Sequence, residues 1–204
     1  MDTLSRLFGR TIAFDDYCNL SHPRIALWRI VCGLLTLGVV ILAWTVLAAI
    51  GARFAAPNLL SGGAPDLQSA DGVLFALGTF VAWPLGLIIV VRLWHRRRFM
   101  SLINENHRIR LAPYAKGFAI AATIGIATII LGALLVGLPV RAATPPNWGL
   151  LLVAAFVLLI VQTASEELLF RGYLQQQLGA RFRSGIWWAI APSFLFGALH
   201  WNPD

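Results

Sequence analysis

Long apolar stretches alternate with shorter polar ones along most of the chain. Four are long enough to cross a hydrocarbon core of ~30 Å, which needs ~20 helical residues, and they run from about 25 to 50, 73 to 94, 117 to 138 and 148 to 170. A fifth begins near residue 186 and has reached only Trp201 when the chain stops. The pattern predicts an all-α fold, a polytopic bundle of about five transmembrane helices.

The fourth and fifth apolar stretches are expected to form an antiparallel hairpin. Polarity rises after Phe170 without a helix breaker, and Gly179 or Ser184 can mark the reversal. In such a hairpin, residues equally far from the turn lie at the same depth.

Composition agrees with a membrane location. The chain is 58% hydrophobic and 12% charged, with a mean hydropathy of +0.74, which excludes a soluble domain of this size. The first apolar stretch follows a polar leader and lacks a small-residue cleavage site, so we interpret it as an anchor rather than a signal peptide.

No internal repeat is present, and we divide the chain into a cytoplasmic leader (1–24), a three-span scaffold (25–145) and a motif-bearing region (146–204).

The net charge of +7 is distributed unevenly. Basic residues concentrate in the leader and in the second and fourth loops, and the other two loops offer only Arg53 and Arg141. The three groups are Arg6, Arg10 and Arg24; Arg96, Arg97, Arg98, Arg108, Arg110 and Lys116; and Arg171, Arg181 and Arg183. Because positive loops stay in the cytoplasm, we expect a cytoplasmic N-terminus and interpret the run 96–98 as a topology signal and not as a binding site. The lipid bilayer is the expected partner of the spans. A nucleic-acid partner is not expected.

Several polar residues are expected to lie at the surface of the cytoplasmic segments. They are the histidines His22, His95 and His107, the run Gln175 to Gln177, and Cys18 as a surface thiol. Cys32 falls in the first span as a small packing residue, and a disulfide is not expected in a reducing compartment.

Two adjacent glutamates, Glu166 and Glu167, interrupt the fourth apolar stretch. A carboxylate in the middle of a membrane costs roughly 2.5 to 3.5 kcal/mol and usually lines a cavity or a reaction site. Glu167 precedes Arg171 by four residues, so the two can pair on one helix face. Glu166 points about 100° away and has no intrahelical cation. We therefore favour Glu166 as the general base.

The fifth apolar stretch contains one ionisable residue, His200, and Phe196 lies one turn before it. Glu166 and His200 lie equally far from Arg183 near the turn, so the hairpin is expected to bring them together. An imidazole and a carboxylate that meet in this way can bind a metal or activate a water.

Two motifs, Glu166-Glu167-x-x-x-Arg171 and Phe196-x-x-x-His200, each lie on an apolar helix. Together they resemble the first two motifs of the CAAX prenyl protease and bacteriocin-processing (CPBP) family of intramembrane proteases, the type II CAAX endopeptidases. The resemblance covers about residues 150–204. It implies that Glu166 activates the hydrolytic water, that His200 holds this water or a metal, and that Glu167, Arg171 and Phe196 support the site.

The family's site also uses a further His and an Asn on a later helix, and Asn202 and Asp204 are too close to His200 to replace them. We therefore expect residues 146–204 to be the N-terminal part of a protease domain that continues in a longer protein. A shortened, inactive relative is the alternative.

The resemblance implies an intramembrane, metalloprotease-like endopeptidase of a bacterial inner membrane that cleaves membrane-associated proteins or peptides. The sequence leaves open whether a divalent cation such as zinc takes part, with Glu166 and His200 as candidate ligands. Two other functions remain open at this point. One is a non-catalytic adaptor or immunity-type protein of the same fold, and the other is a proton-coupled transporter that uses Glu166, Arg171 and His200 as a relay.

Overall fold

The computed structural model describes residues 11–103, 111–137 and 147–201. The chain forms two compact units, one of Met1–His107 with Gly149–Asp204 and one of Arg108–Trp148. The start of the predicted leader, the loop with Arg141, and the residues His107, Asn202 and Asp204 lie outside the described residues.

Most of the described chain is helical, and its strands are the two-residue strands of one small hairpin, which confirms the all-α prediction. The helices long and apolar enough to cross a membrane are α3 (Leu27–Ala55), the rod Ala70–Leu93, α6 (Leu111–Val136) and the rod Trp148–Arg181. The fifth, Ile186–Leu199, is shorter. Strands β1 (Leu60–Ser61) and β2 (Ala64–Pro65) lie in the loop after α3 and the 3-10 turn η1 (Pro57–Leu59). These helices indicate an integral membrane protein.

The second rod changes its winding in the middle. It consists of α4 (Ala70–Gly78), the 3-10 turn η2 (Thr79–Val81) and α5 (Ala82–Leu93). Pro84 follows η2 by three residues. Because proline has no N–H and its ring clashes with the carbonyl four residues earlier, Pro84 displaces the backbone at Phe80. The rod ends at Leu93, and a further 3-10 turn, η3 (Phe99–Leu102), follows it.

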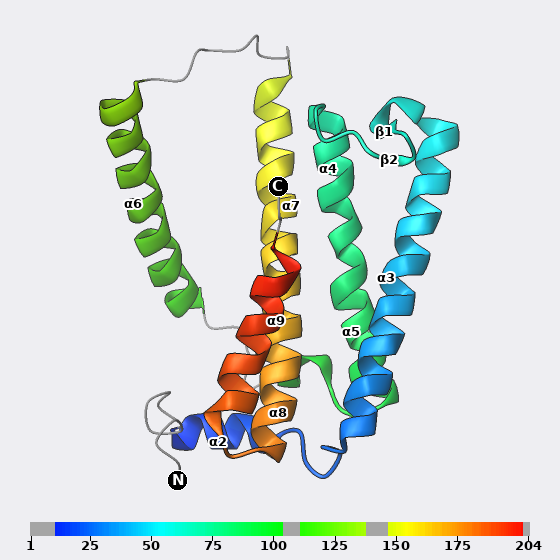
Figure 1. Cartoon of the computed structure of the whole chain (residues 1–204), viewed down its shortest axis with the longest axis vertical. Helices are drawn as coiled ribbons and strands as arrows, with labels where there is room; N and C mark the ends of the chain where they lie inside the picture. Colours follow the sequence, from blue (N-terminus) through cyan, green and yellow to red (C-terminus); the bar gives the residue numbers. More distant parts are fainter. Residues whose placement is uncertain (1–10, 104–110, 138–146, 202–204) are drawn as a thin grey trace. The chain divides into compact units, whose positions relative to one another are not determined.

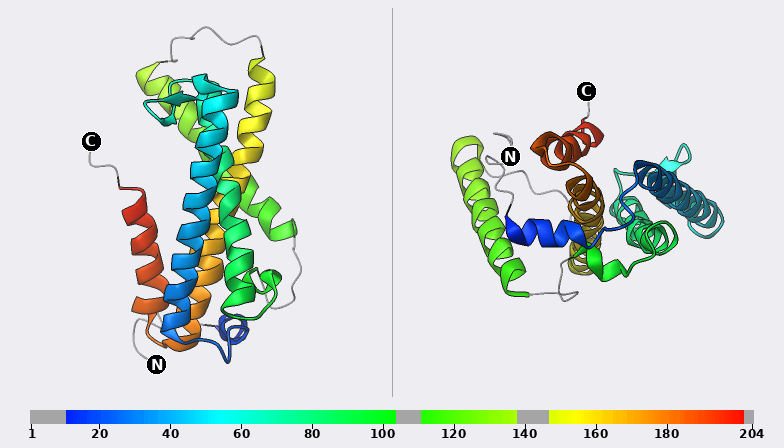
Figure 2. Two further views of the ribbon diagram at one scale, coloured as in Figure 1. Left: turned by 90° about the vertical axis from the view of Figure 1, so that its right-hand side faces the viewer. Right: turned by 90° about the horizontal axis from the view of Figure 1, so that it is seen from below.

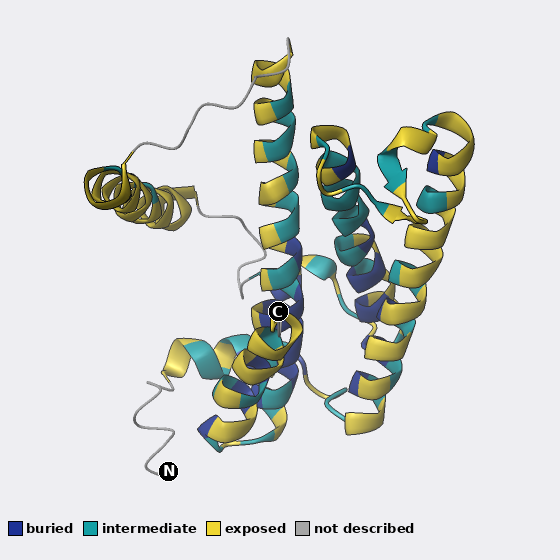
Figure 3. Ribbon diagram, turned by 45° about the horizontal axis from the view of Figure 1, so that its top comes forward, coloured by how far each residue is buried: buried dark blue, intermediate teal, exposed yellow. Residues whose placement is uncertain are grey.

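The larger unit is built around α5. In Figure 1 the rod of α4 and α5 runs antiparallel to α3, and the rod that begins with α7 (Trp148–Glu167) runs on its other side. The buried core includes Leu37 of α3, Leu87 and Val90 of α5, and Leu169 and Tyr173 of the α7 rod. Figure 3 shows the buried residues gathered where these helices meet and the exposed ones on their outer faces.

The predicted hairpin is present in this unit. The α7 rod continues through the π-helical segment η4 (Leu168–Leu174) into α8 (Gln175–Arg181), and the chain then reverses near Ser184. The returning arm consists of the π-helical segment η5 (Ile186–Ile190) and α9 (Ala191–Leu199). Figures 1 and 2 show α9 running back alongside the rod of α7 and α8. Gly179 lies inside α8 rather than at the turn.

The described part of the leader is a packed element. Thr11 caps helix α2 (Ile12–Asn19) by accepting a hydrogen bond from the Phe14 N–H, and α2 packs against α8. Cys18 is 1% exposed, so the prediction of a surface thiol is wrong. Gly179 makes the packing possible, since a Cβ at this position would lie 2.6 Å from the Cys18 sulfur.

The glutamine run is also buried where exposure was predicted. Gln176 and Gln177 have no exposed surface. Gln176 donates to the carbonyls of Tyr17 and Ser101, and it accepts from Arg97. Gln176 lies inside because α2 and the segment after α5 supply polar partners, which offset the cost of removing its amide from water.

His95 provides the third correction, because it is 3% exposed and not solvated. Its Nε2 lies 2.9 Å from Tyr173 Oη, and its Nδ1 lies 3.2 Å from both the Arg24 carbonyl and Gln177 Nε2. Burial, more than the neighbouring arginines, lowers the pKa of His95 from 6.5 to about 4. Burial likewise lowers the pKa of the Arg97 guanidinium to about 10.

The second unit contains the described helix α6. Its most apolar 18-residue window has a mean hydropathy of 2.5, and none of its residues is buried.

Candidate functional site

Glu166 lies near the middle of a rod of 34 residues, Trp148–Arg181. A helix of this length measures roughly 50 Å, longer than a hydrocarbon core of ~30 Å. Part of the rod must therefore extend beyond that layer. The Glu166 side chain is 14% exposed, and Gln162, one turn earlier, donates from Nε2 to its Oε1 over 3.2 Å.

The turn that carries Glu166 packs directly on the middle rod. Ser165 is 1% exposed, and its Oγ lies 2.6 Å from the Val161 carbonyl and 3.3 Å from the Phe80 carbonyl. Phe80 is the position four residues before Pro84, where proline removes the usual helical donor. The displaced carbonyl thus faces a hydroxyl donor beside Glu166, which fixes the height of this turn on α4 and α5.

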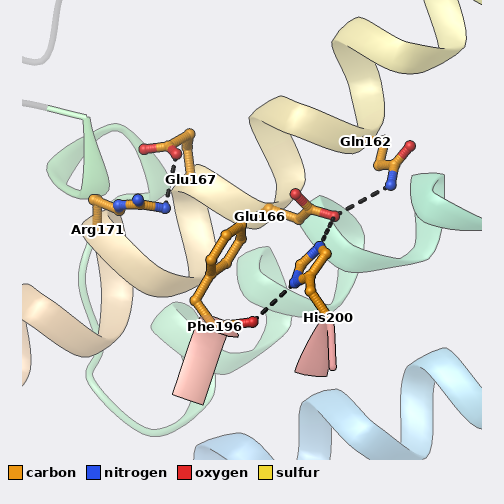
Figure 4. A network of polar contacts seen from close by, with 6 residues as sticks. All are labelled: Gln162, Glu166, Glu167, Arg171, Phe196 and His200. Carbon is orange, nitrogen blue, oxygen red and sulfur yellow. Dashed lines mark hydrogen bonds and ion pairs between the residues drawn. The ribbon is translucent and has the colours of Figure 1, made fainter. Parts of the chain in front are cut away.

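His200 directly follows α9 and lies opposite Glu166, as Figure 4 shows. Its Nε2 is 3.8 Å from Glu166 Oε1. The expected meeting of these two side chains is therefore present. The other ring nitrogen, Nδ1, lies 2.8 Å from the Phe196 carbonyl, which can only accept a hydrogen bond. This contact assigns the proton of a neutral imidazole to Nδ1 and leaves a lone pair on Nε2.

With this proton position, the Glu166 oxygen and His200 Nε2 are both hydrogen-bond acceptors that face each other across the hairpin. Two acceptors cannot form a hydrogen bond with one another directly. Their separation of 3.8 Å lets one water reach both with hydrogen bonds of roughly 2.8 Å. Such a water would donate one proton to Glu166 and the other to His200. The geometry is suited to holding and polarising a water molecule.

The supporting residues form a chain of contacts behind this pair. Arg171 Nη1 lies 2.8 Å from Glu167 Oε1, so the predicted pair is present. The Arg171 guanidinium lies over the Phe196 ring at 5.1 Å, and the centroids of the Phe196 and His200 rings are 4.4 Å apart. Phe170 contacts the Phe196 ring edge to face at 5.2 Å. The contacts of Phe196 with Arg171 and Phe170 join the two arms of the hairpin, and Figure 4 shows Arg171, Phe196 and His200 beside Glu166.

A metal fits this site only in part. Glu166 and His200 offer two donor atoms on the same side, but catalytic zinc sites use three protein ligands. The described residues contain no group of three or more His, Cys, Asp or Glu side chains that could hold a metal ion. The described residues therefore do not complete a three-ligand zinc site.

Sequence reasoning did not assign roles to Gln162 and Ser165. Gln162 carries a detectable signal, since it is a polar residue in an apolar stretch at a spacing of four from Glu166. Ser165 carries none, because its role depends on a carbonyl of another helix. The catalytic roles of Glu166 and His200 remain predictions.

The comparisons with known proteins concern the same region. Residues 147–204 match the family model described as "Type II CAAX prenyl endopeptidase Rce1-like". The resemblance inferred from the two motifs is thereby confirmed over this segment. The fold defines the class, a helical integral membrane protein, and the match shows that residues 147–204 are similar to type II CAAX prenyl endopeptidases.

The relative found among curated proteins is "Uncharacterized protein YyaK" from Bacillus subtilis (strain 168). It is 28% identical to this chain over 122 residues, which are 58% of this chain and 41% of that protein. The matched part is therefore less than half of the relative's length. No solved structure matches the chain.

Proposed function

We propose that this protein is an intramembrane endopeptidase that hydrolyses peptide bonds with a water activated by Glu166. The observation that supports this most directly is the 3.8 Å approach of His200 Nε2 to Glu166 Oε1 across the hairpin. The match of residues 147–204 to a family of CAAX endopeptidases supports the same reaction.

In the proposed reaction the water lies between these two side chains. Glu166 accepts one proton as the water oxygen attacks the carbonyl carbon of the scissile bond, and a tetrahedral intermediate forms. The C–N bond then breaks while the same proton passes to the leaving nitrogen. The products are a carboxylic acid and an amine, and the Glu166 carboxylate is regenerated.

His200 has a positioning role in this scheme. Its Nε2 accepts the second proton of the water in a hydrogen bond, while the Phe196 carbonyl holds Nδ1. The imidazole thus fixes the attacking oxygen relative to Glu166, and positioning of this kind lowers the barrier by removing the entropy of approach.

Membrane-associated peptides or proteins are the proposed substrates, in the inner membrane of a bacterium. Glu166 lies in a helix whose most apolar 18-residue window has a mean hydropathy of 2.1, so we infer that the side chain is reached from within or beside a bilayer. The proposed orientation has the N-terminus in the cytoplasm, because basic residues concentrate in the leader and the second loop.

The test is hydrolysis of a library of membrane-anchored peptides by the purified full-length protein and its Glu166→Gln variant. Glutamine keeps the size of the side chain and removes the base, so the rate should fall by at least ~10² with unchanged expression. Asp71→Asn, a matched change at an exposed acid in the first turn of α4, should leave the rate unaltered. Full activity of Glu166→Gln would refute the proposal. Absence of cleavage by the native protein would favour the non-catalytic adaptor.

A further inference from the structure

Glu166 and Glu167 are adjacent in sequence but have different partners. Arg171 lies 2.8 Å from Glu167 and supplies a full positive charge. Glu166 instead receives the neutral amide of Gln162 at 3.2 Å. An amide can orient a carboxylate through a hydrogen bond without neutralising its charge.

Gln162 contacts the same carboxylate oxygen of Glu166 that faces His200. Gln162 Nε2 donates to Oε1 of Glu166, and this is also the oxygen nearest to His200 Nε2. Figure 4 shows both contacts converging on that atom. Rotation of the carboxylate away from His200 would break the Gln162 contact.

The backbone around Gln162 keeps its side chain in a fixed position relative to Glu166. Gln162 lies on the same α7 rod as Glu166, one turn earlier, and the intervening Ser165 is held on the middle rod. Both residues are partly buried, which restricts their rotamers and strengthens the hydrogen bond relative to one in water. The described residues provide no other amide or cationic donor to Glu166 within hydrogen-bonding distance.

We propose that Gln162 is a positioning residue that holds the Glu166 carboxylate toward His200 for proton transfer from water. The inference rests on the proposed function and adds a residue outside the two motifs that carry the family resemblance. Gln162 acts through the Glu166 carboxylate and contacts neither the attacking water nor the scissile bond in this scheme.

The test uses Gln162→Met in the full-length protein, because methionine keeps the length of the side chain and lacks the donor. The kcat should fall about tenfold, since a misplaced catalytic group costs up to ~10² in rate, while KM and the melting temperature stay unchanged. Gln175→Met, the same substitution at a half-buried glutamine of α8, is the control and should keep the native kcat. Gln162→Ala is a second variant, in which alanine has a high helix propensity and lacks the donor. It should show the same decrease in kcat as Gln162→Met.

A double variant separates positioning from general structural damage. In the Glu166→Gln background, Gln162→Met should cause no further loss, because there is no carboxylate left to hold. An additive loss in that background would overturn the proposal, as would a native kcat in both single variants.

A spectroscopic readout keeps this inference distinct from the proposed function. With isotopically labelled glutamate, the infrared carboxylate band that disappears in Glu166→Gln should shift in Gln162→Met, because a carboxylate that loses a hydrogen bond changes its stretching frequency. An unshifted band would overturn the proposed contact even in an active protease. A shifted band with full activity of Glu166→Gln would refute the proposed activation of water by Glu166 and retain the contact.

Discussion

The guanidinium of Arg171 lies over the ring of Phe196, with its central carbon 5.1 Å from the ring centroid. The two residues belong to the two arms of the hairpin, η4 and α9. The same ring lies 4.4 Å from the imidazole of His200. A basic residue on one arm therefore supports the orientation of the histidine on the other arm.

The first prediction concerns Arg171→Lys. Lysine can still pair with Glu167, but it has no planar group to lie on Phe196. A cation–π contact at a partly exposed site contributes about 0.5 to 1 kcal/mol, so hydrolysis should fall roughly two- to fivefold while the free energy of unfolding falls by no more than about 1 kcal/mol. A native rate would show that the stack does not position His200. The assay is steady-state cleavage alongside thermal unfolding.

The second prediction tests proximity across the hairpin. Cysteines at positions 166 and 200, in a background without Cys18 and Cys32, should be joined by a short bifunctional reagent because the native side chains lie 3.8 Å apart. The control pair uses positions 167 and 200, since Glu167 faces Arg171 and points about 100° away from Glu166. Equal crosslinking of both pairs, measured by gel mobility after cleavage in the α8–α9 turn, would contradict the geometry.

The third prediction is a dependence of stability on pH that arises from His95. Burial lowers the pKa of His95 in the folded protein from 6.5 to about 4, so the unfolded chain binds the proton more tightly. Above pH 6.5 His95 is neutral in both the folded and the unfolded protein, so it adds no pH dependence to the stability. As the pH falls from 6.5 to 4 the unfolded state gains protons first, and stability should decrease.

The His95 effect is measured as the melting temperature between pH 7.5 and 4. His95→Gln should remove most of the decrease below pH 6.5, because the substituted side chain does not titrate. A control is His22→Gln, at an exposed position before α3, which should keep the native slope. Identical slopes for the native protein and His95→Gln would contradict the buried, neutral histidine.

The fourth prediction compares two glycines of α3. A Cβ at Gly33 would overlap Tyr173 Oη and lie 2.9 Å from a methyl group of Val90. Gly33→Ala should therefore destabilise the protein by about 1 to 3 kcal/mol through overpacking. Gly38→Ala has open space around its Cβ and should be neutral or stabilising by up to ~1 kcal/mol. Chemical unfolding in detergent measures both changes in stability. A larger loss for Gly38→Ala than for Gly33→Ala would contradict the packing of α3 on Tyr173 and Val90.

The fifth prediction is the orientation in the membrane. A reporter fused after Arg98 should report a cytoplasmic location, and one fused between Ser61 and Pro65 an external location, because the basic residues lie near the first site. The opposite pattern would reverse the side from which a substrate reaches Glu166.

Hydrophobic runs predict the helices well because each span must satisfy its backbone internally and expose apolar side chains to lipid. The fourth run even begins at the observed residue, Trp148. The pairing of Glu166 with His200 could be predicted because it depends only on equal distances from a turn. The family resemblance could be inferred from two short motifs that fall at this spacing.

The polar interior at the end of the bundle could not be predicted from local sequence. Gln176 looks like an exposed residue, and only its partners Tyr17 and Ser101, remote in sequence, explain its burial. Cys18 is buried for the same reason, since α2 meets α8. Polarity along the chain indicates the cost of burial but not which distant groups offset it.

The packing of α2 on α8 has a consequence for the order of assembly. Tyr17 and Gln176 are 159 residues apart, so the ribosome must synthesise the chain as far as Gln176 before their contact can form. Membrane insertion of α3 therefore precedes the docking of the helix that comes before it. The end of the bundle formed by α2 and α8 therefore closes only after both α3 and the α7 rod have been synthesised, and a tag fused close to α2 would delay that step without altering insertion.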